Sequence, residues 1–440
     1  MPSFHVQNFG CRASQADGAA IEAGLLRAGL DPAQAGSSAD FVVLNSCTVT
    51  AFADDDLRKA AHRVHRENPS ARILVTGCYA QRAPDELAVL PGVYWVVGNS
   101  HKTKISEIIC DAGVHAAPPA VPYHGEIHVS DIFAQRDFLS APVEDASGDR
   151  TRPNLKIQDG CNNRCSFCII PFVRGRSRSA PAGQVIAQVR DLASKYREVV
   201  LSGINLGRWG REPGNNIRLA DLIRRPLDET PPERLRLSSV EPMDWSDDLL
   251  ALVASSDRIA KHVHAPLQSG SDRVLRRMHR KYRPRHYEDR IRQARAAMPD
   301  AAIGADVMTG FPGETGAEFE ESRAFIHSLP FTYLHVFTYS ERPGTPAASN
   351  SAQVPMEVRR ERNRILRELA AEKNLEFRRR MLGRTLSVVT LSDAALSDNF
   401  LKVELATPRP ANQLIEVTIG AVSSTGLVES GAPLHLPPVL

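Results

Sequence analysis

The chain has 440 residues, of which 42% are hydrophobic and 24% are charged, and its formal net charge is +3. This length predicts two or three domains, and the composition is typical of a folded protein and excludes general disorder. No apolar run reaches the roughly 18 residues of a membrane span, and no secretory signal pattern opens the chain. We therefore expect a cytoplasmic protein without membrane contact, and so small a charge does not by itself indicate nucleic-acid binding.

Residues 1–112 alternate short apolar segments with amphipathic ones, which is typical of a parallel α/β domain. The expected strands and helices are, in chain order, Phe4–Gln7, Gln15–Ala28, Phe41–Leu44, Asp54–Glu67, Arg72–Val75 and Tyr94–Val97. A cysteine follows three of the strands, at Cys11, Cys47 and Cys78. Because sites in open α/β sheets gather beyond the carboxyl ends of the strands, these cysteines are expected to converge on one rim.

The next regions differ in pattern. Residues 113–150 lose the alternation and are predicted to be a linker, with Ala117–Pro122 and Glu144–Asp149 as its clearest parts. Residues 151–380 resume it and fit a partial or full (β/α) barrel. Its expected strands are Leu155–Ile157, Glu198–Leu201, Arg234–Leu237, His262–His264, Ile303–Met308 and Tyr333–Phe337, and a charged helix over Met356–Arg380 follows. Residues 381–440 predict a small antiparallel β-barrel.

Three cysteines form a compact group directly after the first barrel strand, at Cys161, Cys165 and Cys168. Thiolates are the natural ligands of iron–sulfur clusters, and three on one loop hold three irons of a four-iron cluster and leave the fourth open. The open iron can bind the amino and carboxylate groups of S-adenosylmethionine, whose sulfonium bond then breaks to give a 5′-deoxyadenosyl radical. A structural zinc site is disfavoured because it needs four ligands, and no fourth cysteine or histidine stands close by.

The other cysteines are scattered, and each alone could be an ordinary core residue. Cys11, Cys47 and Cys78 share a setting, since each follows an apolar segment and a small or polar neighbour, which favours a common site. Cys110 lies on an expected helix and is assigned to packing.

Polar residues at the ends of later barrel strands are candidates for contact with S-adenosylmethionine. They are Ser202, Gly203 and Asn205 after the second strand, Glu241 after the third and Gln268 after the fourth. A tight turn is the alternative for the glycine loop. The basic run Arg273–Arg285 and the group Arg378–Arg380 are either solvated faces or phosphate contacts.

Taken together, these motifs resemble the methylthiotransferase family of radical S-adenosylmethionine enzymes over nearly the whole chain. The matching segments are Asn8–Cys11, Leu44–Thr50, Thr76–Gln81, Cys161–Pro171, Arg174–Gly175, His264–Ser271, Thr309–Glu314, Leu334–Ser340 and Arg342–Pro346. The resemblance implies that Cys11, Cys47 and Cys78 hold a second [4Fe–4S] cluster, which holds or delivers sulfur. It also implies that residues 381–440 form an RNA-binding barrel of the TRAM type.

Within the family, Cys47–Asp54 and the Arg12 that follows the first cysteine resemble the branch that acts on threonylcarbamoyladenosine in tRNA. That branch adds a methylthio group to carbon 2 of the base, next to the anticodon, and uses two molecules of S-adenosylmethionine per turnover. Ser14 stands where the family commonly has asparagine. The expected partners are tRNA, an electron donor such as flavodoxin or ferredoxin, and a sulfur donor.

Three alternatives stay open at this point. Two are the methylthiolation of isopentenyladenosine in tRNA and of an aspartate in a ribosomal protein. The third is a non-catalytic, RNA-binding iron–sulfur electron carrier.

Overall fold

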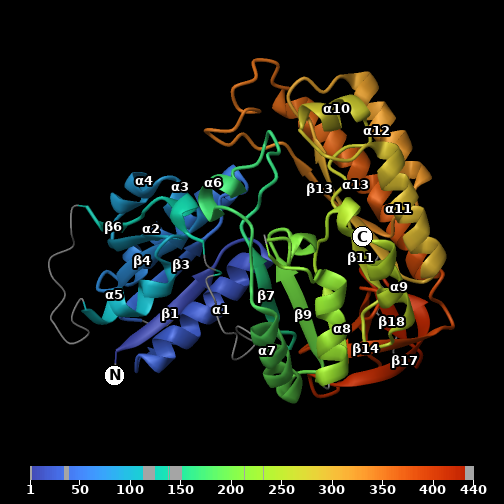
Figure 1. The fold of residues 1–440 in the computed structure, drawn as a ribbon, viewed down its shortest axis with the longest axis horizontal. Helices are drawn as coiled ribbons and strands as arrows, with labels where there is room; N and C mark the ends of the chain where they lie inside the picture. The colour runs from blue at the N-terminus through green and yellow to red at the C-terminus, as the bar shows by residue number, and fades with distance from the viewer. Residues whose placement is uncertain are drawn as a thin grey trace, which may run out of the picture.

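The computed structural model describes residues 2–33, 39–111, 124–136, 138, 151–212, 214–230 and 232–431. These residues form an N-terminal α/β sheet, a central partial β/α barrel and a C-terminal closed β-barrel (Figure 1). The predicted linker parts Ala117–Pro122 and Glu144–Asp149 lie outside them. Among the helices that the structure describes, none has the length and apolar character needed to cross a membrane.

The N-terminal sheet has the strand order β2-β1-β3-β4-β5-β6, and all its pairs are parallel. Its strands are β1 (Ser3–Asn8), β2 (Asp31–Pro32), β3 (Phe41–Ser46), β4 (Arg72–Gly77), β5 (Val93–Gly98) and β6 (Glu126–His128). β3, β4 and β5 are buried along their whole length, as their continuous apolar runs predict. β6 lies in the segment expected to be a linker and extends this sheet beside β5.

Helices cover both faces of this sheet. They are α1 (Arg12–Arg27), α2 (Ala51–Glu67), α3 (Cys78–Arg82), α4 (Pro84–Ala88) and α5 (Ile105–Asp111). Apolar side chains of α1 and α5 pack on one face, and those of α2, α3 and α4 pack on the other. α1 also contacts β7 (Asn154–Asp159) and β9 (Glu198–Gly203) of the next domain. It is therefore held between the first sheet and the barrel (Figure 1).

The central domain confirms the six expected barrel strands. β9 pairs in parallel with β7 on one side and with β10 (Arg234–Leu237) on the other, and β8 (Arg178–Ser179) adds an antiparallel edge to β7. β11 (His262–His264), β12 (Ala302–Thr309) and β13 (Tyr333–Thr338) form the second parallel group. A bridge between Leu235 and Ile259 links the two groups, so the strands curve into a partial barrel whose edges are formed by β8 and β13.

The helices of this domain follow its strands in the expected alternation. They are α6 (Ile170–Arg174), α7 (Ala182–Lys195), α8 (Leu219–Glu229), α9 (Asp247–Ser255), α10 (Asp272–Arg277), α11 (Pro284–Ala297), α12 (Gly316–Ser328) and α13 (Met356–Arg379). Their apolar faces pack around the barrel strands in one large core.

The C-terminal region is a closed barrel in the order β14-β15-β16-β18-β17, as expected for a small β-barrel. Its strands are β14 (Thr385–Thr390), β15 (Ala395–Ser397), β16 (Lys402–Glu404), β17 (Leu414–Val422) and β18 (Leu427–Glu429). All pairs are antiparallel except β16 with β18, which is parallel. The small barrel docks on the large one, where the ring of Phe400 stacks on His262 with centroids 4.4 Å apart.

Candidate iron–sulfur and radical site

The contiguous cysteine loop begins where β7 ends, at the carboxyl end of the strand. Gly160 makes the turn with φ +68°, and a Cβ there would lie 2.0 Å from the carbonyl oxygen of Arg176, so only glycine fits. The loop is closed by the backbone amide of Cys161, which donates to the Gly175 carbonyl (3.1 Å), and by that of Cys168, which donates to Cys165 (3.1 Å). The turn thus gathers three thiols at the mouth of the barrel.

The environment of these thiols is partly buried and supplies hydrogen-bond donors. The side-chain amide of Asn205 lies 3.7 Å from the Sγ of Cys161. The guanidinium of Arg280 lies 3.2 Å from the Sγ of Cys165 and also pairs with Glu241. Burial raises the pKa of Cys161, and it raises that of Cys168 to about 12. Burial disfavours a free thiolate here, whereas a thiolate bound to iron would share its charge with the metal and accept hydrogen bonds from these donors.

The five residues expected to contact S-adenosylmethionine have different surroundings in the structure. Asn205 and Glu241 reach the cysteine loop as described. The hydroxyl of Ser202 donates to the Leu155 carbonyl (3.4 Å), and Gly203 lies against Gln158, so these two fit a packing role at the strand end. The side-chain oxygen of Gln268 is buried and accepts no hydrogen bond from the described residues, so it is open to a ligand.

The dispersed cysteines come together on one rim of the first sheet. Cys11, Cys47 and Cys78 follow β1, β3 and β4, which are neighbours in the sheet order. A hydrogen bond shared by the thiols of Cys11 and Cys47 lowers the pKa of the first and raises that of the second. The nearby Cys78 raises the pKa of Cys47 further. These mutual effects require the three sulfur atoms to be close, as a common site needs.

Gly10 shows how closely the two outer loops approach each other. A Cβ at this glycine would lie 2.8 Å from the Sγ of Cys47, and its φ is +99°. Glycine is therefore needed both for the backbone conformation and for the space beside the thiol.

Two polar side chains lie beside the thiol of Cys78. The Nε of Arg174 lies 3.3 Å from its Sγ, and the side-chain amide of Asn99 lies 3.6 Å from it. Arg174 belongs to α6 of the barrel domain and is 1% exposed, so a residue of the second domain is buried against a cysteine of the first. Its Nη2 also lies 3.5 Å from Ser14, whose hydroxyl lies 3.6 Å from the Sγ of Cys11.

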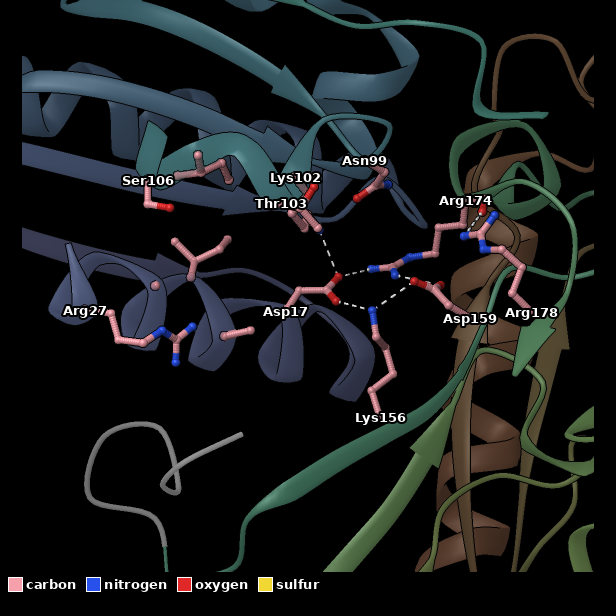
Figure 2. Close-up of a pocket in the computed structure, with 14 residues that line it drawn as sticks. Asp17, Arg27, Asn99, Lys102, Thr103, Ser106, Lys156, Asp159, Arg174 and Arg178 are labelled. Atoms are coloured by element: carbon pink, nitrogen blue, oxygen red, sulfur yellow. Dashed lines mark hydrogen bonds and ion pairs between the residues drawn. The ribbon is translucent and has the colours of Figure 1, made fainter. Parts of the chain in front are cut away.

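A buried ionic network surrounds Arg174 (Figure 2). Its guanidinium donates to Asp159 (3.0 Å) and to Asp17 on α1 (2.9 Å). Lys156 pairs with both carboxylates, and Lys102 pairs with Asp17 (2.8 Å). Burial alone would raise the pKa of Asp17, but its cationic neighbours hold it well below the usual range. A cavity of about 160 Å³ lies beside this network, between α1 and α5.

The network joins the two cysteine groups. Asp159 is two residues from Cys161, and Arg174 contacts Cys78, so one guanidinium spans the short path between both loops. Sequence reasoning missed Asp17, Asp159 and Arg174 as site residues. Arg174 did fall in a matching segment, but nothing in the sequence indicates which acids it meets.

The basic run on α10 and after it is divided between the interior and the surface. Arg280 is buried at the cysteine loop, and Arg277 pairs with Glu318 (2.7 Å). Arg276 pairs with Asp272 (2.8 Å), and Arg378 donates to the Ser423 carbonyl (2.6 Å). Arg277, Arg280 and Arg378 therefore support the fold, whereas the exposed members of the run are Arg273, Arg276, Lys281 and Arg285.

Two family models match this chain, one over the barrel domain and one over the N-terminal domain. Residues 155–326 match the model of the radical SAM superfamily, and residues 3–98 match the model described as uncharacterized protein family UPF0004. The threonylcarbamoyladenosine tRNA methylthiotransferase MtaB of Bacillus subtilis is 38% identical over 98% of this chain and 95% of its own length. The chain belongs to the radical SAM methylthiotransferase family.

Other members of this family are similar over comparable lengths. MtaB of Aquifex aeolicus is 34% identical, over 94% of this chain and 99% of that protein. The tRNA-2-methylthio-N(6)-dimethylallyladenosine synthase of Saccharopolyspora erythraea is 32% identical, over 98% and 87%. Among solved structures, the radical S-adenosylmethionine methyltransferase TsrM of Kitasatospora setae has a TM-score of 0.54 at 15% identity, covering 79% of this chain and 77% of that one. The last likeness concerns the fold alone.

As a member of this family, the chain uses two [4Fe–4S] clusters and S-adenosylmethionine. The donor set fits two such clusters, because each group offers three thiols and no fourth cysteine among the described residues joins either group. Cys110, the remaining cysteine, is half-buried on α5 and packs against the core of the first sheet.

Proposed function

We propose that this protein is a tRNA methylthiotransferase that adds a methylthio group to carbon 2 of N6-threonylcarbamoyladenosine. The relatives MtaB carry this activity in their names, and they match nearly the full length of the chain. The observation that carries the proposal is the buried guanidinium of Arg174, which contacts Cys78 of one cysteine group and Asp159, two residues before the other group. A reaction that needs both a radical and a sulfur atom requires such a pair at one substrate.

The residues divide into two roles under this proposal. We assign Cys161, Cys165 and Cys168 to the radical-generating cluster and Cys11, Cys47 and Cys78 to the sulfur-handling one. When bound, the first cluster and S-adenosylmethionine supply the radical, and the second supplies the sulfur. Asn205 and Arg280 hold the thiolates of the first loop, while Arg174 and Asn99 do so for Cys78.

The C-terminal barrel is the proposed RNA-binding part. It closes on itself, docks on the base of the radical barrel and resembles a TRAM domain, with the domain limits 1–112, 113–150, 151–380 and 381–440 as our prediction. We infer further that an electron donor such as flavodoxin or ferredoxin and a sulfur donor serve the enzyme in the cytoplasm.

Anaerobic reconstitution tests the two-cluster assignment. The protein should bind about eight irons per chain, and Cys47→Ala should bind about four. A wild-type content of about four, unchanged in Cys47→Ala, would contradict the assignment.

Mass spectrometry of tRNA nucleosides from a deletion strain tests the substrate. Loss of 2-methylthio-threonylcarbamoyladenosine supports the proposal, and an unchanged profile defeats it. Loss of the isopentenyladenosine derivative instead would assign the protein to the branch of the dimethylallyladenosine synthases. Failure of the reduced protein to cleave S-adenosylmethionine would favour an electron carrier.

A further inference from the structure

Two histidines and an aspartate meet on the inner face of the radical barrel. His264 is the last residue of β11, Asp306 lies midway along β12, and His335 lies within β13. The strand pairing sets Asp306 opposite His335, and it sets His264 opposite the residue two positions before Asp306. The three side chains therefore share one face, because alternate residues of a strand point the same way. The opposite face of β12, with Ala305 and Val307, belongs to the core under the helices.

The nitrogen and oxygen atoms of these side chains converge. The Nδ1 of His335 lies 3.1 Å from the Oδ1 of Asp306, and the Nε2 of His264 lies 3.2 Å from the same oxygen. All three atoms lie within 4.8 Å of one another. A divalent metal with bonds of about 2.0–2.2 Å holds neighbouring ligand atoms about 3 Å apart, so the two nitrogen–oxygen distances already suit one.

One nitrogen of this group lacks a hydrogen bond. The Nε2 of His264 is close to Asp306 but is not aligned for a hydrogen bond with it, and no other described residue offers it a partner. The side chain of His264 is only 9% exposed, and an unpaired polar atom so far buried is costly unless a ligand completes it. Its other ring nitrogen, Nδ1, lies 3.1 Å from the hydroxyl of Ser239. Metal-binding histidines have this arrangement, with one nitrogen fixed by a hydrogen bond and the other free to ligate.

The group lies on the side of the lumen that leads to the contiguous cysteine loop. Ser239 follows the carboxyl end of β10, and the chain reaches Glu241 two residues later. Glu241 pairs with Arg280, whose guanidinium lies 3.2 Å from the Sγ of Cys165. A short path of polar side chains thus connects His264 with the rim of the barrel.

Aromatic rings pack below the group, toward the amino ends of the strands. His262 shares a hydrogen bond with the hydroxyl of Tyr333 (2.7 Å) and stacks on Phe400 of the C-terminal barrel. His262 and Tyr333 each lie two residues before a histidine of the group. The side chain of His335, in contrast, is 56% exposed. The open side of the group is therefore accessible to a ligand.

We propose that His264, Asp306 and His335 bind one divalent metal ion, at a site separate from the two cysteine groups. Two imidazoles and one carboxylate are a donor set that suits Zn²⁺ and Fe²⁺, and three protein ligands leave room for water or an oxygen ligand. The ion uses the unpaired nitrogen of His264 and balances the charge of Asp306. The inference goes beyond the proposed function and does not depend on which nucleoside the enzyme modifies.

Zinc binding to the reconstituted protein tests this site. Protein with both clusters loaded is washed with a chelator and dialysed against Zn²⁺, and its zinc and iron are then counted by mass spectrometry. Loaded clusters occupy the six cysteines of the two groups, so the wild type should bind about one zinc per chain while its iron stays constant. Zinc-edge X-ray absorption should show nitrogen and oxygen neighbours at about 2.0–2.2 Å, and sulfur at about 2.3 Å would overturn the inference.

Two variants and one control locate the ion. Ser239→Ala leaves the ligands in place but removes the partner of the His264 ring, so zinc affinity should fall about 10-fold. Asp306→Asn removes the anionic ligand and should weaken zinc binding by at least about 100-fold, beyond the usual effect of a supporting residue. His327→Gln, at an exposed histidine near the end of α12, should bind zinc like the wild type.

Three results would overturn the inference. The first is a wild type with full iron content that binds no zinc. The second is equal zinc affinity in the wild type and Asp306→Asn, which would place the ion elsewhere. The third applies if Asp306→Asn fails to load its clusters: Ser239→Ala with full iron content and unchanged zinc affinity then decides against the site.

Discussion

The two cysteine groups of this molecule are built by different means. Cys161, Cys165 and Cys168 lie on one turn after one strand, and all three are half-buried. Cys11, Cys47 and Cys78 come from three strand ends, and two of them are at most 4% exposed. The first group depends on a local turn, whereas the second exists only when three parallel strands have paired. The contrast implies that the dispersed group is the more sensitive to changes elsewhere in the fold.

The largest expected effect separates the two groups by their chemistry. Cys165→Ala should abolish cleavage of S-adenosylmethionine, since it removes a thiolate from the radical-generating loop. Cys47→Ala should keep that cleavage but form no methylthio product. Quantifying 5′-deoxyadenosine and modified nucleoside in the same reactions checks both outcomes. Equal loss of 5′-deoxyadenosine in the two variants would contradict the assignment of one cysteine group to radical generation and the other to sulfur handling.

Arg174→Gln tests the link between the groups. It leaves Asp17 and Asp159 buried with fewer positive partners, so the free energy of unfolding should fall by about 3–5 kcal/mol. Denaturant unfolding of the reconstituted protein measures this change. Arg66→Gln removes an exposed pair on α2 and should change stability by less than about 1 kcal/mol. Similar losses in the two variants would mean that the network does not hold the domains together.

Gly10→Ala perturbs only the dispersed group. The new Cβ would press on Cys47 and force a residue other than glycine to adopt a φ of +99°, a strain of about 1–3 kcal/mol. Iron content should fall toward that of Cys47→Ala, while cleavage of S-adenosylmethionine persists. Gly183→Ala on α7, where a Cβ meets nothing within 4 Å, is the matched control and should bind iron normally. Normal iron in both variants would show that the rim tolerates the change.

Asn205→Ala should have the smallest effect, because it removes one long hydrogen bond that an uncharged amide donates to Cys161. A bond of about 0.5–1.5 kcal/mol predicts a 2- to 10-fold slower cleavage of S-adenosylmethionine, with iron content unchanged. Single-turnover kinetics under reduction measures the rate. Loss of the cluster would instead make Asn205 part of its assembly.

Much of the fold could be predicted because the pattern of apolar residues along the chain indicates which segments are buried. The apolar runs of Phe41–Leu44 and Arg72–Val75 indicate buried strands, and the structure shows them within β3 and β4. The charged helix expected over Met356–Arg380 was found over Met356–Arg379. β6 was not predicted, because three residues are too few to show a period, and pairing with β5 alone defines it.

The cysteines of the candidate site could be predicted from the sequence, but the charged residues around them could not. Cysteines after strand ends indicate a rim in any parallel sheet, so the group of Cys11, Cys47 and Cys78 could be expected to converge. The partners of Arg174 are 96 residues away at Cys78 and 157 away at Asp17, and no local pattern connects them. For the same reason, the sequence did not decide whether the basic run Arg273–Arg285 is a solvated face or a phosphate contact. The structure shows that one member, Arg280, is buried against Cys165.

The sequence by itself therefore determined the class of chemistry, because three thiols on one turn and three at strand ends are set by residue type and local spacing. Only the tertiary structure decided how the two groups meet and which arginines lie beside their thiols. An ion pair or its absence depends on distances between segments far apart in the chain, and those distances exist only after the domains have packed.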